Sequence, residues 1–115
     1  MEDTREELIF NNRIKLITQL SEFKMSLWVN GFGLKNAATD EEIIPLVSFF
    51  NLEEFEEKEN SIVIKFRIYP NGAKDYLMEV FPFEKTFIFL DKTYHTTDYY
   101  KTIMNEVKPS KQHQI

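Results

Sequence analysis

The stretch 61–90 constrains the fold of this chain more than any other, because it contains three alternating runs separated by two turn signals. The runs read SIVIKFRIY, KDYLMEVF and TFIFL, and the segments between them read PNGA and PFEK. Period-two alternation of β-branched and aromatic residues is typical of strands. Proline presets φ and Asn-Gly accepts positive φ, so the first break is a turn. The sequence therefore predicts an antiparallel meander over 61–90.

The faces of this meander follow from the charges in its first two runs. In the first run the apolar set faces the core, because the other set carries charge; the apolar set is Ile62, Ile64, Phe66 and Ile68, and the other is Val63, Lys65, Arg67 and Tyr69. In the second run Tyr76, Met78 and Val80 alternate with Asp75, Leu77, Glu79 and Phe81. We expect Lys65 and Arg67 to pair across strands with Asp75 and Glu79.

Three further segments predict helices. Residues 4–7 (TREE) and 39–42 (TDEE) have the capping-box pattern of a helix start. Apolar residues at three- and four-residue spacings follow the first box and predict a helix over 4–22. The second box opens a helix in which Pro45 predicts a kink, with a short second piece from Asn51. A last helix, capped by Thr96 or Thr97, extends to about Val107.

Between the first two helices, residues 23–29 alternate and predict a strand, although the first helix could also extend to Trp28. Residues 31–36 contain two glycines and predict a loop. The resulting order, α-β-α-β-β-β-α, indicates an α+β fold. It has a three- to four-stranded antiparallel sheet, with N-terminal, middle and C-terminal helices packed mainly on one face. We expect one globular domain over 1–108 and a flexible C-terminal tail over 109–115.

Composition excludes several classes of function. The chain has no cysteine, which rules out disulfides, thiolate catalysis and cysteine-based metal sites. Its net charge of −5 opposes nucleic-acid binding, which depends on Lys and Arg neutralising phosphates. No apolar run reaches the ~20 residues of a membrane span, and the acidic N-terminus is not a secretory signal. We therefore expect a cytoplasmic protein without a cofactor that binds neither nucleic acid nor membrane.

His95 is the one candidate for catalysis in the part expected to be ordered. It lies between Asp91 and Asp98, close in sequence to Tyr94, Tyr99 and Tyr100. A carboxylate could orient it as a general base. The alternative is a half-exposed histidine beside a helix start, and a metal site would lack a second histidine. We assign no catalytic residue and no metal ligand.

The run 53–59 is the most acidic part of the chain. It offers a candidate docking surface for a basic protein, because charge complementarity sets association rate and specificity; the residues are Glu53, Glu54, Phe55, Glu56, Glu57 and Glu59. Phe55 is either an aromatic anchor of this surface or a core residue. Trp28 could mark an interface on an outer sheet face. The alternative for the acidic run is an ordinary solvated face.

Three hypotheses of function remain open. The first is a non-enzymatic inhibitor whose acidic surface docks on a basic partner, by analogy a bacterial immunity protein that neutralises a toxin such as a nuclease. The second is a small ligand-binding or enzymatic domain that uses His95 and the nearby tyrosines. The third is a structural homodimer that pairs through an exposed edge strand, with 23–29 as the candidate edge.

Overall fold

The computed structural model of the protein describes residues 3–23, 27–69 and 74–107. This part of the chain is built almost entirely of strands, and its helical segment follows the last of them. The elements are β1 (Asp3–Ile9), β2 (Ile14–Phe23), β3 (Leu27–Asn36), β4 (Glu42–Val47), β5 (Phe50–Glu57), β6 (Ile62–Ile68), β7 (Tyr76–Phe81), β8 (Thr86–Phe89), β9 (Lys92–His95), the 3₁₀ helix η2 (Thr96–Asp98) and the helix α1 (Tyr99–Glu106).

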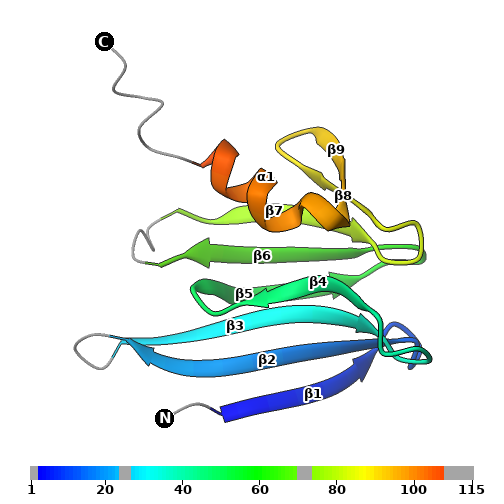
Figure 1. Cartoon of the computed structure of the whole chain (residues 1–115), viewed down its shortest axis with the longest axis horizontal. Helices are drawn as coiled ribbons and strands as arrows, with labels where there is room; N and C mark the ends of the chain where they lie inside the picture. Colours follow the sequence, from blue (N-terminus) through cyan, green and yellow to red (C-terminus); the bar gives the residue numbers. More distant parts are fainter. Residues whose placement is uncertain (1–2, 24–26, 70–73, 108–115) are drawn as a thin grey trace.

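The strands form two antiparallel meanders, which we call the first and second sheets. The first sheet has the order β1-β2-β3-β4 and the second has the order β5-β6-β7-β8-β9. Strand β5 lies beside β3 (Figure 1), where the Asn30 N–H donates to Asn51 Oδ1 at 2.7 Å. Strand β4, η2 and α1 also contact one another. The two sheets therefore share a single packed interior.

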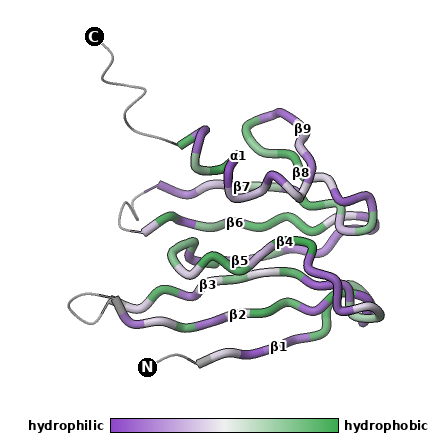
Figure 2. Tube along the Cα trace, viewed as in Figure 1, coloured by the Kyte–Doolittle hydropathy of each residue, from purple (hydrophilic) through white to green (hydrophobic). Residues whose placement is uncertain are grey.

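The core is rich in phenylalanine, of which the chain has eleven. The rings of Phe32 and Phe66 lie 5.8 Å apart and connect the two sheets. Tyr99 of α1 places its ring 5.9 Å from Phe50 and 5.7 Å from Phe87. Figure 2 shows apolar and polar positions alternating along the strands, as expected for sheets with one buried face. These aromatic contacts fix α1 against the second sheet.

The α+β fold class is wrong, since two antiparallel sheets make up most of the described chain. Two parts of the prediction are confirmed. The three predicted runs of the meander form β6, β7 and β8, with the predicted residues of β6 buried. The first predicted turn, 70–73, lies outside the described residues. The C-terminal helix forms as η2 followed by α1, but its cap is Asp98, which makes no side-chain capping bond.

The helix predicted over 4–22 is a β-hairpin. Strands β1 and β2 pair from Asp3↔Leu20 to Ile9↔Ile14. Phe10, Asn11 and Asn12 all have positive φ and form the turn between them, a conformation that asparagine tolerates well. In β2 the buried residues Ile14 and Leu16 lie on one face of the strand, whereas the next buried residue, Ser21, lies on the opposite face. The turn and this change of face together produced three- and four-residue spacings that resemble a helix.

The loop predicted over 31–36 belongs to β3. Both glycines face the backbone of β4: a Cβ on Gly33 would lie 2.8 Å from the Ile44 oxygen, and one on Gly31 would lie 3.0 Å from the Val47 oxygen. Glycine in a strand interior often marks such a close approach. The residues at both ends of the strand predicted over 23–29 are in strands, but in two different ones, because β2 finishes at Phe23 and β3 starts at Leu27. Neither strand is an edge of the first sheet. The centre of the predicted strand, 24–26, lies outside the described residues.

The helix predicted from residue 39 is also wrong, as is the short second helical piece from Asn51. The first segment forms β4 and the second forms β5. Pro45 is compatible with this result because β4 is an edge strand, where a missing N–H costs no ladder bond. The predicted tail over 109–115 lies outside the described residues. In the described part, no helix is long and apolar enough to cross a membrane.

Candidate functional site

The outer face of the second sheet carries the side chains that alternate with its core residues. Strand pairing places Lys65 of β6 opposite both Glu54 of β5 and Leu77 of β7. Glu79 of β7 lies opposite Val63 on one side and Ile88 of β8 on the other. Because paired residues of neighbouring strands project to the same side, these residues form one continuous surface.

Two hollows on this face meet at Val63 and Leu77. One has a volume of about 490 Å³ and extends over β7 and β8 to Leu90. The other has a volume of about 180 Å³ and reaches Glu54 and Glu56. Leu77 is 61% exposed and Leu90 is 50% exposed, so two large apolar side chains on this face are open to solvent. We call this surface the outer groove and define it by Glu54, Glu56, Val63, Leu77, Glu79 and Leu90.

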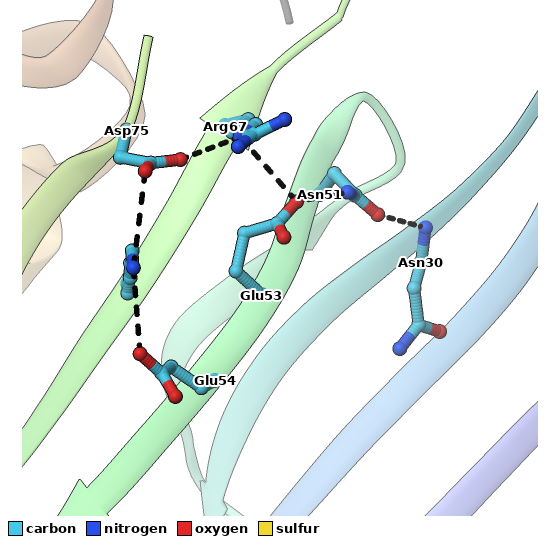
Figure 3. A network of polar contacts seen from close by, with 7 residues as sticks. Asn30, Asn51, Glu53, Glu54, Arg67 and Asp75 are labelled. Carbon is cyan, nitrogen blue, oxygen red and sulfur yellow. Dashed lines mark hydrogen bonds and ion pairs between the residues drawn. The ribbon is translucent and has the colours of Figure 1, made fainter. Parts of the chain in front are cut away.

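A network of ion pairs borders the outer groove (Figure 3). Arg67 hydrogen-bonds Asp75, and its Nε lies 3.8 Å from Glu53 Oε2. Lys65 Nζ lies 3.4 Å from Glu54 Oε2 and 3.8 Å from Asp75 Oδ2. The hydrogen bond from Arg67 lowers the pKa of the Asp75 carboxyl below its ordinary value. The network connects three neighbouring strands and holds their register on this face.

The predicted cross-strand pairing is therefore confirmed for Asp75 and wrong for Glu79. The Glu79 carboxylate instead accepts a hydrogen bond of 2.6 Å from the buried Ser61 hydroxyl. This bond fixes the Glu79 side chain beside Val63. Its charge remains at the border of the outer groove.

The side chains of the acidic run 53–59 lie in different environments in the structure. Glu54 and Glu56 line the outer groove together with Phe55, which is half-buried and packs against the core. Glu53 lies next to Arg67. Glu59 is exposed between β5 and β6. The run thus forms neither one continuous acidic patch nor a helical face.

Two members of the run differ sharply in their contacts. The Glu57 carboxylate accepts a hydrogen bond of 2.6 Å from the Phe10 N–H, and this bond connects β5 to the turn between β1 and β2. Glu56 makes no hydrogen bond or ion pair within the described ranges. Glu57 therefore has a structural role, whereas Glu56 keeps an uncompensated charge beside exposed Leu77.

His95 does not form the site that its sequence neighbours suggested. It is exposed at the end of β9 and makes no side-chain capping bond to η2. No group of three or more metal-ligating side chains occurs among the residues that the structure describes, so Asp91, His95 and Asp98 form no such cluster.

The nearby tyrosines also diverge from His95. Tyr99 is buried in the core, Tyr100 packs its ring 6.2 Å from Phe50, and the Tyr94 hydroxyl lies 3.4 Å from Glu106 Oε2. Tyr99 and Tyr100 both contact Phe50, whereas the ring of Tyr94 lies 5.5 Å from that of Phe87. Among the residues that the structure describes, His95 makes no hydrogen bond, ion pair or ring contact with any of these tyrosines.

Sequence reasoning missed the apolar part of the outer groove. Leu77 belongs to the set that alternates with core residues in the second run of the meander, between Asp75 and Glu79. A leucine on an otherwise charged face was the available signal. Trp28, the other predicted marker of an interface, is exposed at the start of β3 on the first sheet. It therefore belongs to a different surface from the outer groove.

Comparison of the chain with protein-family models, with curated proteins and with solved structures finds no match.

Proposed function

We propose that this protein is a non-enzymatic binding protein that docks a basic partner protein on its outer groove. The single observation that carries the proposal is the position of exposed Leu77 between carboxylates on an ordered sheet face. Protein interfaces combine an apolar centre with a polar rim. The outer groove has this organisation in a region where strand pairing holds the backbone.

The charges at the rim favour a basic partner. Glu56 is uncompensated within the described chain, and Glu79 is bonded only to a neutral hydroxyl. Lys65 and Arg67 offset part of the negative charge of Glu54 and Asp75. Lys58 and Lys74 also line the larger hollow, but the five carboxylates that line the two hollows outnumber their three lysines. A lysine or arginine of the partner would pair with Glu56 while an apolar side chain covers Leu77. Such pairing speeds the encounter and makes it sensitive to salt.

The class of function that we favour is an inhibitor. A small acidic protein that covers the basic active-site cleft of a toxin would need no chemistry of its own. A bacterial immunity protein that neutralises a toxic nuclease in the cytoplasm is the analogy of similar size and charge. This assignment rests on the negative charge of the chain and on the outer groove. The partner that it implies is a protein.

The test is affinity capture from native extract at low and high salt, read by quantitative mass spectrometry, with four variants. Leu77→Arg and the double variant Glu56→Gln/Glu79→Gln change the outer groove. Leu20→Arg on the first sheet and Glu84→Gln in the turn after β7 are matched controls, since both sites are exposed and lie outside it. We expect one basic protein that is lost at high salt and from both groove variants but retained by both controls.

Reconstitution then separates docking from inhibition. The captured protein is purified and its affinity for each variant is measured by calorimetry. If it is a nuclease, its activity is measured with and without the wild-type chain. Binding that is equally strong in Leu77→Arg and in the wild type would refute the outer groove as the docking site. Binding without inhibition would leave docking standing and exclude the inhibitor class.

A further inference from the structure

Strand β1 is a regular, uncovered sheet edge. It pairs with β2 in an unbroken register over all seven of its residues and contains no proline. No strand pairs with its other side within the described ranges, and Figure 1 shows it at the margin of the first sheet. Residues 4–8 are all exposed. Such an edge presents unpaired N–H and C=O groups that can accept another strand.

The other sheet edges are protected. Strand β4 contains Pro45, has irregular register against β3 and contacts α1. Strand β5 lies beside β3. Strand β9 has four residues and contacts α1. Edges are protected against edge-to-edge pairing when they are short, bulged or covered, and β1 has none of these features. Its charged side chains also protect the edge, except against a strand whose charges are complementary.

The charges along β1 are complementary to those of a second copy of the same strand. Antiparallel pairing about a two-fold axis perpendicular to the sheet places residues of the same face opposite each other. If the axis passes through Glu6, Arg5 of each copy lies opposite Glu7 of the other, and Thr4 lies opposite Leu8. The symmetry therefore creates two Arg5–Glu7 pairs for every dimer.

Other registers are less favourable. An axis through Arg5 sets the two Arg5 side chains opposite each other, and an axis through Glu7 does the same with the two Glu7 side chains. Both lose the two Arg5–Glu7 pairs. The axis through Glu6 also sets one like-charged pair together, but it gains two opposite-charged pairs and pairs all seven residues of β1. An axis through Thr4 would set Arg5 opposite Asp3 twice, but it would pair only residues 3–5 of the strand.

We propose that two copies of this protein associate through β1, in antiparallel register centred on Glu6, and extend the first sheet across a two-fold axis. This surface is distinct from the outer groove, so the proposal does not depend on the docking function. A contact made by one strand from each copy is small, and small interfaces are weak. Association is therefore expected at high protein concentration and fast to reverse.

A charge swap tests both the partner and the register. We measure association by sedimentation velocity over a wide range of concentration for the wild type, Arg5→Glu, Glu7→Arg and the double variant Arg5→Glu/Glu7→Arg. Each single variant converts two attractive pairs into repulsive ones, which should weaken the dimer roughly 5- to 30-fold. The double variant restores opposite charges in both pairs and should recover the wild-type constant. Circular dichroism checks that each variant is folded.

Two further variants sharpen the result. Glu6→Thr removes the one repulsive pair on the axis and is expected to tighten the dimer severalfold. Lys92→Glu on β9, the short edge of the second sheet, is the matched charge-reversal control and should change nothing. A wild-type protein that stays monomeric at every concentration would overturn the proposal, even if β1 accepts a strand from another protein. So would a dimer that the double variant fails to restore.

Discussion

Tyr99 contains a buried hydroxyl without a hydrogen-bond partner, so removing that hydroxyl should stabilise the protein. The residue is the first of α1, is 1% exposed, and packs between Phe50 and Phe87. Its hydroxyl has no partner in the part of the chain that the structure describes. An unpaired buried hydroxyl costs about 1–3 kcal/mol relative to its hydrated state. Tyr99→Phe removes this cost and keeps the ring.

The gain is reduced by the small cavity that the missing oxygen leaves. At about 24 cal/mol per Å³, a cavity of one atom costs a few tenths of a kcal/mol. We therefore expect Tyr99→Phe to raise the free energy of unfolding by about 1 kcal/mol and the melting temperature by about 4 °C. Urea denaturation followed by tryptophan fluorescence and calorimetry measures both quantities. Tyr100→Phe is the matched control, because Tyr100 is 46% exposed and should change stability by less than about 0.5 kcal/mol.

The pH dependence provides an independent check of the same hydroxyl. Burial raises the pKa of Tyr99 above its ordinary value of 10.0. Below the unfolded-state pKa the phenol is neutral in both states. As the pH rises above it, the unfolded state loses the proton and the folded state keeps it, so wild-type stability falls. Tyr99→Phe lacks this loss, and its advantage should widen above about pH 10. A variant that is instead less stable than the wild type at pH 7 would refute the reasoning, because the hydroxyl would then have a partner.

Three further predictions concern the glycine contact, the hairpin turn and the ion-pair network. Gly33→Ala should destabilise the protein by about 1–3 kcal/mol in urea denaturation, because the new methyl group would overlap the backbone of β4; unchanged stability would contradict the close approach. Glu57→Ala should cost about 1.5–3 kcal/mol and accelerate hydrogen exchange of the Phe10 amide, since it removes a charge-assisted bond, whereas Glu57→Gln should cost less. The pKa of the Asp75 carboxyl is lowered chiefly by Arg67, so the stability from this pair is present above the ordinary carboxyl pKa and is lost as the pH falls through the folded value. In an NMR titration, Arg67→Ala should move the pKa of Asp75 upward, and no movement would show that Arg67 is not the cause.

The ion-pair network and the outer groove show which parts of the structure residue patterns alone can predict. The alternation in 61–90 predicts β6, β7, β8, the core face of β6 and the pairing of Arg67 with Asp75. The same alternation places Leu77 on the charged face. It does not reveal that Leu77 lies in a groove, because the groove also needs residues of β5 and β8. These two strands lie on either side of β6 and β7 only because of the strand order in the second sheet, which the local pattern does not specify.

The acidic run illustrates the opposite case. Glutamate has a low strand propensity, so 53–59 resembles a helical or solvated segment. Pairing with Lys65 and burial of Phe50 in the core override that preference, and the run becomes part of β5. Because side chains alternate along a strand and β5 has a bulge between Leu52 and Glu54, the carboxylates of the run point in different directions. Glu57 then reaches the Phe10 amide, while Glu56 remains free to contact a partner.

The sequence by itself determined the local periodicity of the central meander, the C-terminal helix, the phenylalanine-rich core and the absence of cysteine chemistry. These properties depend on neighbours in the chain or on composition. Only the tertiary structure decided that 4–22 and 39–57 each form two strands joined by a turn rather than helices, because capping-box residues and apolar spacings fit more than one local conformation. The close approach of β4 to Gly33, the exposed edge of β1 and the outer groove depend on contacts between distant segments, and long-range packing rather than local preference selects among the alternatives.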